Sequence, residues 1–159
     1  MNYIDKIQNL KNKELKTLIL SGNNITQLEN LYHLKKLQNL EIEKNLLEDI
    51  NNLTIFGFRD LRRIVFAFNR IPLGYFEELL LILEAFKTLE EVNFVGNEVT
   101  LHKLYRAKIL MFPNIQVLDK LALREPIKKH FEVIYFSLWN ENIFFFLKIF
   151  FFFLEEKFF

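Results

Sequence analysis

One spaced pattern of apolar residues and asparagine occurs four times in this chain of 159 residues. Each copy has apolar residues at its first, fourth, sixth and eleventh positions and an asparagine at its ninth. The copies begin at Leu15, Leu37, Leu61 and Leu89, and their asparagines are Asn23, Asn45, Asn69 and Asn97. From asparagine to asparagine the intervals are 22, 24 and 28 residues, and such a period indicates a solenoid of stacked repeats.

Within each copy, apolar and variable residues alternate around the fourth and sixth positions, as they do in a short β-strand. One repeat cannot bury its own apolar side, so neighbouring repeats must stack their strands into a parallel sheet over a continuous core. In this pattern the chain resembles the leucine-rich repeat proteins. The resemblance implies an α/β fold, namely a right-handed solenoid with the parallel sheet on its concave face and short helices or turns on its convex face.

The asparagine of each copy is expected where the chain turns away from the strand. Its amide can there satisfy backbone groups that would otherwise be buried without hydrogen-bond partners. Because buried polar groups are normally hydrogen-bonded, we interpret the four asparagines as structural residues and not as a ligand site.

The repeats occupy residues 15–99, and residues 1–14 are interpreted as a partial amino-terminal repeat. This interpretation depends on three apolar residues that match the descending part of the unit. They are Ile4, Ile7 and Leu10. The longest interval contains an apolar periodic stretch from Leu73 to Phe86 that predicts a helix, with Pro72 near its start.

Residues 100–136 are interpreted as a carboxy-terminal cap, because a tyrosine-arginine pair, a proline and a closing leucine-aspartate pair follow the last repeat. The motif resembles the cap of the 22-residue repeat subfamily that is similar to the regulatory subunit of protein phosphatase 1. This subfamily includes the leucine-rich light chain of axonemal dynein and the spliceosomal A-prime protein, and the resemblance covers residues 15–119. The residues to which it assigns a structural capping role are Tyr105, Arg106, Pro113 and Asp119.

The chemistry of these residue types is consistent with closing the end of a solenoid. The Tyr105 ring can cover the last apolar layer while its hydroxyl reaches water or a backbone carbonyl. Arg106 can pair with an acidic neighbour such as Asp119. Pro113 is expected to end a short helix and to direct the chain back into a last strand.

The predicted concave face carries the variable strand positions, and its most unusual part lies across the third and fourth repeats. There an apolar set with polar and charged neighbours has the anatomy of a protein interface. The residues predicted to bind a partner are Arg63, Val65, Ala67, Phe68, Glu91, Asn93 and Val95. The alternative is that Phe68 folds into its own loop and that the others are scattered surface residues, which are common.

Composition argues against several other classes of function. The formal net charge is +1, with 21 basic and 20 acidic residues, so no charge excess favours direct nucleic-acid or anionic membrane binding. The chain contains no cysteine, which excludes disulfides and thiolate metal sites. Three scattered histidines and four glycines predict neither a metal site nor a phosphate loop. We therefore expect no enzyme activity, no catalytic residues, no metal and no cofactor.

The predicted function is a protein-binding scaffold or adaptor. The cap resemblance favours a place in cilia, axonemes or the cytoskeleton, with tubulin or dynein subunits as partners, and residues 94–97 form a turn similar to that of the dynein light chain. The alternative is a nuclear or regulatory subunit, because the spacing of Val99-Thr100 and Tyr105-Arg106 is similar to that of the spliceosomal protein. The first function implies the cytoplasm or cilium, and the second implies the nucleus.

Residues 137–159 form a phenylalanine-rich tail, and residues 143–159 contain nine of the 19 phenylalanines. A membrane span needs about 20 apolar residues. Here Lys148 interrupts the run and Glu155 ends it, so a membrane anchor is the weaker alternative. We interpret the tail as an artefact of translated T-rich DNA, and we expect it to be dispensable for folding.

Overall fold

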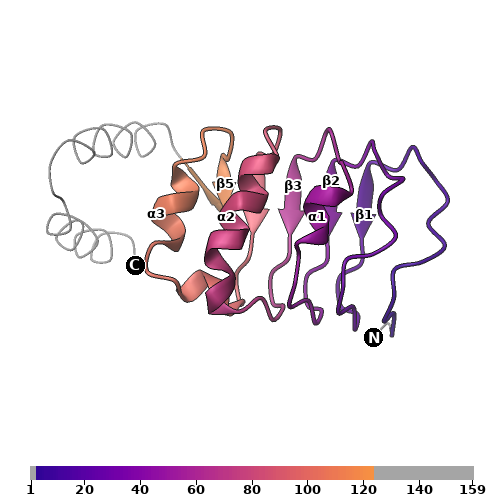
Figure 1. The fold of residues 1–159 in the computed structure, drawn as a ribbon, viewed down its shortest axis with the longest axis horizontal. Helices are drawn as coiled ribbons and strands as arrows, with labels where there is room; N and C mark the ends of the chain where they lie inside the picture. The colour runs from indigo at the N-terminus through magenta and orange to yellow at the C-terminus, as the bar shows by residue number, and fades with distance from the viewer. Residues whose placement is uncertain (1–2, 124–159) are drawn as a thin grey trace, which may run out of the picture. The chain divides into compact units, whose positions relative to one another are not determined.

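The computed structural model describes residues 3–123. Their strands form one six-stranded sheet in chain order, in which β1 to β5 are parallel and β6 is antiparallel to β5. The strands are β1 (Thr17–Ile19), β2 (Asn39–Glu41), β3 (Arg63–Val65), β4 (Glu91–Asn93), β5 (Val117–Leu118) and β6 (Leu121–Ala122). Successive repeats therefore lie side by side along the sheet, which confirms the predicted solenoid (Figure 1).

The sheet register follows the repeat pattern of the sequence. The fourth residue of each copy pairs with the fourth residue of the next, so that Leu18, Leu40 and Ile64 are neighbours across β1 to β3. Val92 and Leu118 continue the same row through β4 and β5. These inward residues are all buried, and one continuous apolar core runs through the stacked repeats.

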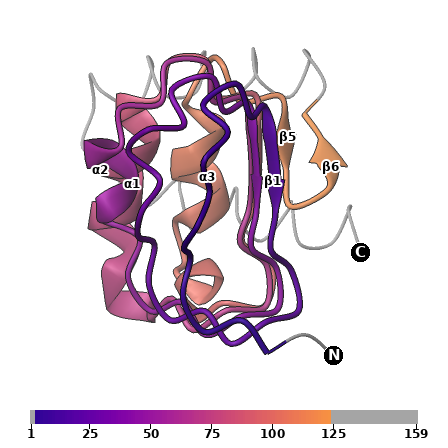
Figure 2. The same cartoon turned by 90° about the vertical axis from the view of Figure 1, so that its right-hand side faces the viewer.

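Helices and turns form the layer opposite the strands (Figure 2). They include α1 (Asn52–Ile55), η1 (Leu73–Tyr75), α2 (Phe76–Ala85), η2 (Glu98–Leu101) and α3 (Tyr105–Leu110). The helix predicted from Leu73 to Phe86 is present as η1 followed by α2. Helix α2 buries four apolar side chains, which are Phe76, Leu79, Ile82 and Leu83.

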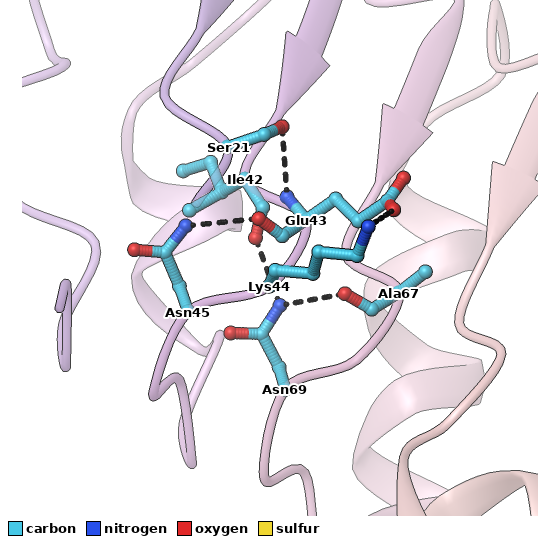
Figure 3. A network of polar contacts seen from close by, with 7 residues as sticks. All are labelled: Ser21, Ile42, Glu43, Lys44, Asn45, Ala67 and Asn69. Atoms are coloured by element: carbon cyan, nitrogen blue, oxygen red, sulfur yellow. Dashed lines mark hydrogen bonds and ion pairs between the residues drawn. The ribbon is translucent and has the colours of Figure 1, made fainter. Parts of the chain in front are cut away.

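The four repeat asparagines are buried and connect neighbouring repeats. In Asn69, the amide Nδ2 donates to the carbonyls of Ile42 at 2.8 Å and Phe66 at 2.9 Å, and Oδ1 accepts the Leu47 N–H at 3.0 Å. Asn45 and Asn97 make the equivalent contacts with the repeats before them, and Figure 3 shows part of this network. We call Asn23, Asn45, Asn69 and Asn97 the asparagine ladder. The contacts confirm its predicted structural role.

The segment before β1 packs against the first complete repeat through polar side chains. Asn23 Oδ1 accepts the Ile4 N–H at 3.2 Å, and Asn30 Nδ2 donates to the Ile7 carbonyl at 2.7 Å. The Ile7 side chain is buried in the core. Residues of the predicted partial repeat therefore cover the amino-terminal end of the first complete repeat.

Two predictions from the sequence fall outside the described residues. These are the distal part of the cap, residues 124–136, and the phenylalanine-rich tail, residues 137–159. Between residues 3 and 123, no helix has the length and apolar character that crossing a membrane requires.

We predict that Asn69→Ala lowers the free energy of unfolding by about 2–4 kcal/mol, because the buried Ile42 carbonyl and Leu47 N–H lose their partner and the Phe66 carbonyl keeps only its bond from Asn97. Asn24→Ala is the matched control, since Asn24 is exposed and should change stability by about 0.5 kcal/mol or less. Urea denaturation measures both variants. Equal stability of the two variants would contradict a structural role for the ladder.

Candidate protein-binding surface

The face of the sheet that points away from the helices carries two rows of strand side chains. This is the face predicted to be concave, and we call it the outer sheet face. The first row contains Thr17, Asn39, Arg63, Glu91 and Val117, and the second contains Ile19, Glu41, Val65 and Asn93. Backbone hydrogen bonds extend the alignment beyond the strands, because the N–H groups of Lys44 and Phe68 donate to the carbonyls of Ala67 and Val95. The predicted partner-binding residues therefore lie on β3 and β4 or within three residues after these two strands.

Arg63 occupies the centre of this face and joins three strands. Its Nε lies 3.0 Å from Glu91 Oε1 on β4, and its guanidinium also pairs with Glu41 on β2. Partial burial lowers the pKa of Arg63, but the hydrogen bonds and negative charges of Glu91 and Glu41 outweigh it and raise that pKa above its ordinary value. Two carboxylates share one guanidinium, so this centre has a net negative charge.

The apolar centre predicted for this face is smaller than expected. Val65 is 2% exposed, Ala67 0% and Asn93 1%, so these three residues offer almost no surface to a partner. The physical reason is that neighbouring strands flank these residues on both sides: in the sheet register Val65 lies between Glu41 of β2 and Asn93 of β4. The prediction that Val65, Ala67 and Asn93 contribute contact area is therefore corrected.

The exposed apolar side chains of the face are Ile19, Phe68 and Val95. Phe68 is 46% exposed and Val95 36%, so both are accessible to a partner, and Ile19 on β1 is 60% exposed. Ile19 is not among the residues predicted to bind a partner, although a large apolar residue at a variable strand position is the signal that identifies it. Ile19 lies beside Glu41 of the charged centre, whereas Phe68 and Val95 follow the carboxyl ends of β3 and β4.

The residue before each ladder asparagine has a left-handed backbone conformation. The φ angles are +72° at Gly22, +55° at Lys44, +55° at Phe68 and +76° at Gly96. We call these four residues the rim. Glycine adopts this conformation readily, whereas a residue with a side chain incurs a cost of about 1–2 kcal/mol. Figure 3 shows Lys44 beside Glu43, whose carboxylate lies 3.5 Å from the Lys44 ammonium.

The alternative interpretation, in which Phe68 folds into its own loop, is wrong. The Phe68 ring lies against Gly96, where a side-chain carbon added to the glycine would come within 2.5 Å of the ring, so Gly96 is needed for space as well as for conformation. The Lys44 ammonium lies 5.9 Å from the ring centroid, within cation–π range. The ring is therefore held between two neighbouring repeats.

The cap residues close the carboxy-terminal end of the sheet through a partly buried hydrogen bond. The Tyr105 hydroxyl donates to Asp119 Oδ1 at 3.3 Å, and the same oxygen accepts the Phe94 N–H at 2.9 Å. Burial raises the pKa of both Tyr105 and Asp119. The carboxylate thus takes the place of the water or backbone carbonyl that was expected as the tyrosine's partner.

Two further cap predictions have different outcomes. The predicted Arg106–Asp119 ion pair is wrong, because Arg106 is exposed and forms no ion pair among residues 3–123. The physical reason is that the Arg106 side chain lies in solvent, whereas Asp119 is partly buried and bonded to Tyr105 and to the Phe94 N–H. The Arg106 charge still lowers the pKa of Asp119, but burial raises that pKa by more. Helix α3 ends at Leu110, shortly before Pro113, and the chain then enters β5 as expected.

The histidines of the described region have structural surroundings. The His102 ring stacks on Phe76 with centroids 3.9 Å apart, and His33 Nε2 contacts the Leu10 carbonyl. Within residues 3–123, no group of three or more potential ligands could hold a metal ion.

A hollow of about 520 Å³ beside the rim is lined by Glu48, Asn69, Arg70, Pro72, Gly96 and Glu98.

Solved structures of other proteins share this fold. A chain of the Drosophila melanogaster SNF/U2A' complex matches with a TM-score of 0.69 and 25% identity, over 83% of this chain and 76% of its own length. The internalin InlF of Listeria monocytogenes matches with a TM-score of 0.54 and 23% identity, over 67% of this chain and 28% of its own. No protein-family model and no curated protein sequence matches the chain. The comparisons confirm the leucine-rich repeat fold and the resemblance to the spliceosomal A-prime type.

We predict that Lys44→Gly raises the free energy of unfolding by about 0.5–1 kcal/mol, because glycine removes the left-handed strain. The variant also loses the partly exposed ion pair with Glu43 and the cation–π contact with Phe68, which offset only part of this gain. Gly22→Ala introduces a side chain at the equivalent position and should lower stability by a similar amount. Denaturant titration measures both changes, and a destabilised Lys44→Gly variant would contradict the strain assigned to the rim.

We predict that Asp119 makes stability decrease with rising pH. Because burial raises its folded-state pKa above the ordinary 3.8, the folded state binds the proton more tightly than the unfolded chain. Stability should therefore fall as the pH increases from about 3.8 through the folded-state pKa. Asp119→Asn keeps an oxygen acceptor without the charge. As the pH rises through this range, the variant should therefore become increasingly more stable than the wild type. A difference that stays constant with pH contradicts the prediction.

Proposed function

We propose that this leucine-rich repeat protein is a non-catalytic scaffold that binds another protein on its outer sheet face. The observation that carries the proposal is the combination of exposed apolar side chains, Ile19, Phe68 and Val95, with the charged centre of Arg63, Glu41 and Glu91. Apolar anchors beside polar groups are the usual anatomy of a protein interface. A repeat scaffold holds such groups in fixed register and so presents them with little loss of conformational entropy.

The finer form of the proposal is a subunit of a nuclear protein complex. The support is the likeness to a chain of the SNF/U2A' complex, which spans most of both chains. This form implies a protein partner and a nuclear location. The ciliary or cytoskeletal adaptor, with tubulin or dynein subunits as partners, has no comparable support and stays a prediction from the cap resemblance.

Affinity capture from a lysate of the source organism tests the proposal with three forms of the full chain. The first is the wild type, the second carries Ile19→Glu and Val95→Glu on the outer sheet face, and the third carries Ile55→Glu and Leu81→Glu on the helical side. All four substituted residues are exposed, so each variant should fold. Circular dichroism during thermal unfolding checks this before the capture.

We expect the wild type and the helical-side variant to recover the same proteins and the sheet-face variant to lose them by about tenfold or more. Recovery of splicing proteins supports the nuclear subunit, whereas tubulin or dynein subunits support the adaptor. Proteins that are lost only with the helical-side variant would place the binding surface on the opposite layer and would contradict the proposal.

A further inference from the structure

Phe68 is a bulky aromatic residue in a backbone position that favours glycine. Two of the four rim positions are glycine, and Phe68 has φ of +55°. An aromatic residue rarely adopts this conformation, and the fold would be maintained at lower conformational cost with glycine. Strained residues of this kind concentrate at functional sites, so the strain raises the question of what the ring does.

The surroundings of the ring fix its place. On the side of β4 it lies against Gly96, and on the side of β2 the Lys44 ammonium lies 5.9 Å from its centroid. Nearly half of the side chain nevertheless stays exposed. Its backbone N–H is bonded to the Val95 carbonyl at 2.6 Å, which anchors the residue to the next repeat. The ring is therefore a partly exposed apolar surface held in place just beyond the carboxyl end of β3.

The hollow of about 520 Å³ adjoins this surface, because Gly96 contacts the ring and also lines the hollow. Its charged lining residues are Glu48, Arg70 and Glu98. Among the described residues, neither glutamate belongs to an ion pair. Two carboxylates against one guanidinium give the hollow a net negative charge. A cationic side chain is the occupant with complementary charge.

We propose that the Phe68 ring and the adjoining hollow form one recognition site for a basic segment of a partner protein. An arginine or lysine of the segment enters the hollow between Glu48 and Glu98, and a neighbouring large apolar residue packs on the ring. The aromatic ring also favours a cation at its face, as it does for Lys44. This inference rests on the proposed scaffold function and names the chemistry of its partner.

A library of random twelve-residue peptides, displayed on phage and selected on the immobilised full chain, tests the site. Selected peptides are then synthesised, and their affinities are measured for six proteins. These are the wild type, Phe68→Gly, Glu48→Gln with Glu98→Gln, the sheet-face variant with Ile19→Glu and Val95→Glu, and two matched controls. Asn9→Gly introduces glycine at another exposed left-handed position, in the segment before β1, and Glu77→Gln with Glu78→Gln removes two exposed carboxylates from α2.

We expect enriched peptides to contain arginine or lysine beside a large apolar residue and to bind the wild type and both controls alike. Phe68→Gly should weaken binding by about tenfold, the size of an interface anchor. The Glu48 and Glu98 double variant should weaken it by about fivefold and reduce its dependence on salt, because fewer charges are paired. Thermal unfolding confirms that each variant is folded.

Three results would overturn the inference: no enrichment, enrichment of acidic peptides, or equal affinities for Phe68→Gly and Asn9→Gly. These outcomes are separate from those of the scaffold proposal. If basic peptides bind but lose affinity only with Ile19→Glu and Val95→Glu, the outer sheet face binds its partner and the Phe68 site is wrong. If the lysate experiment fails while peptides select as expected, the site stands as a peptide site without the proposed scaffold role.

Discussion

A buried asparagine amide joins each repeat to the one before it, and the remaining architecture depends on this contact. The amide donates to carbonyls of two repeats and accepts an N–H of the earlier one, as at Asn69. Buried backbone groups at these turns have no strand partner, so their loss would leave unsatisfied donors and acceptors. The ladder thereby fixes both the register of the sheet and the tight turn that gives the rim its left-handed conformation.

The sequence could predict whatever depends on the repeat itself. The inward residues, the parallel register, the ladder contacts and the helix from Leu73 follow from positions within the unit. It could not predict the burial of Val65, because that burial depends on how the side chains of neighbouring strands, such as Glu41 and Asn93, pack beside it. The same limit applies to Asp119, which hydrogen-bonds to Tyr105 and to the Phe94 N–H instead of forming an ion pair with Arg106. The pattern describes positions within one repeat, so it does not predict which side chains of neighbouring repeats contact one another.

The two ends of the described solenoid are closed by different means. At the carboxy-terminal end, β6 turns back antiparallel on β5, and the Asp119 carboxylate accepts a backbone N–H of the preceding repeat. At the other end, the polar contacts of Asn23 and Asn30 hold residues 3–14 against the first repeat. Between these ends lies a surface whose groups are fixed in place by the repeats, which is what a binding scaffold requires. The strained Phe68 is the part of that surface that stability alone does not explain.

Hydroxyl-radical footprinting of the full chain, free and bound to a partner recovered by affinity capture, tests the central claim most directly. The claim is that the partner covers the outer sheet face and the rim. It predicts that the reactivity of Ile19, Phe68 and Val95 falls in the complex, while Ile55 and Leu81 on the helical side keep theirs. Protection of Ile55 and Leu81 with unchanged reactivity of Phe68 and Ile19 would contradict it.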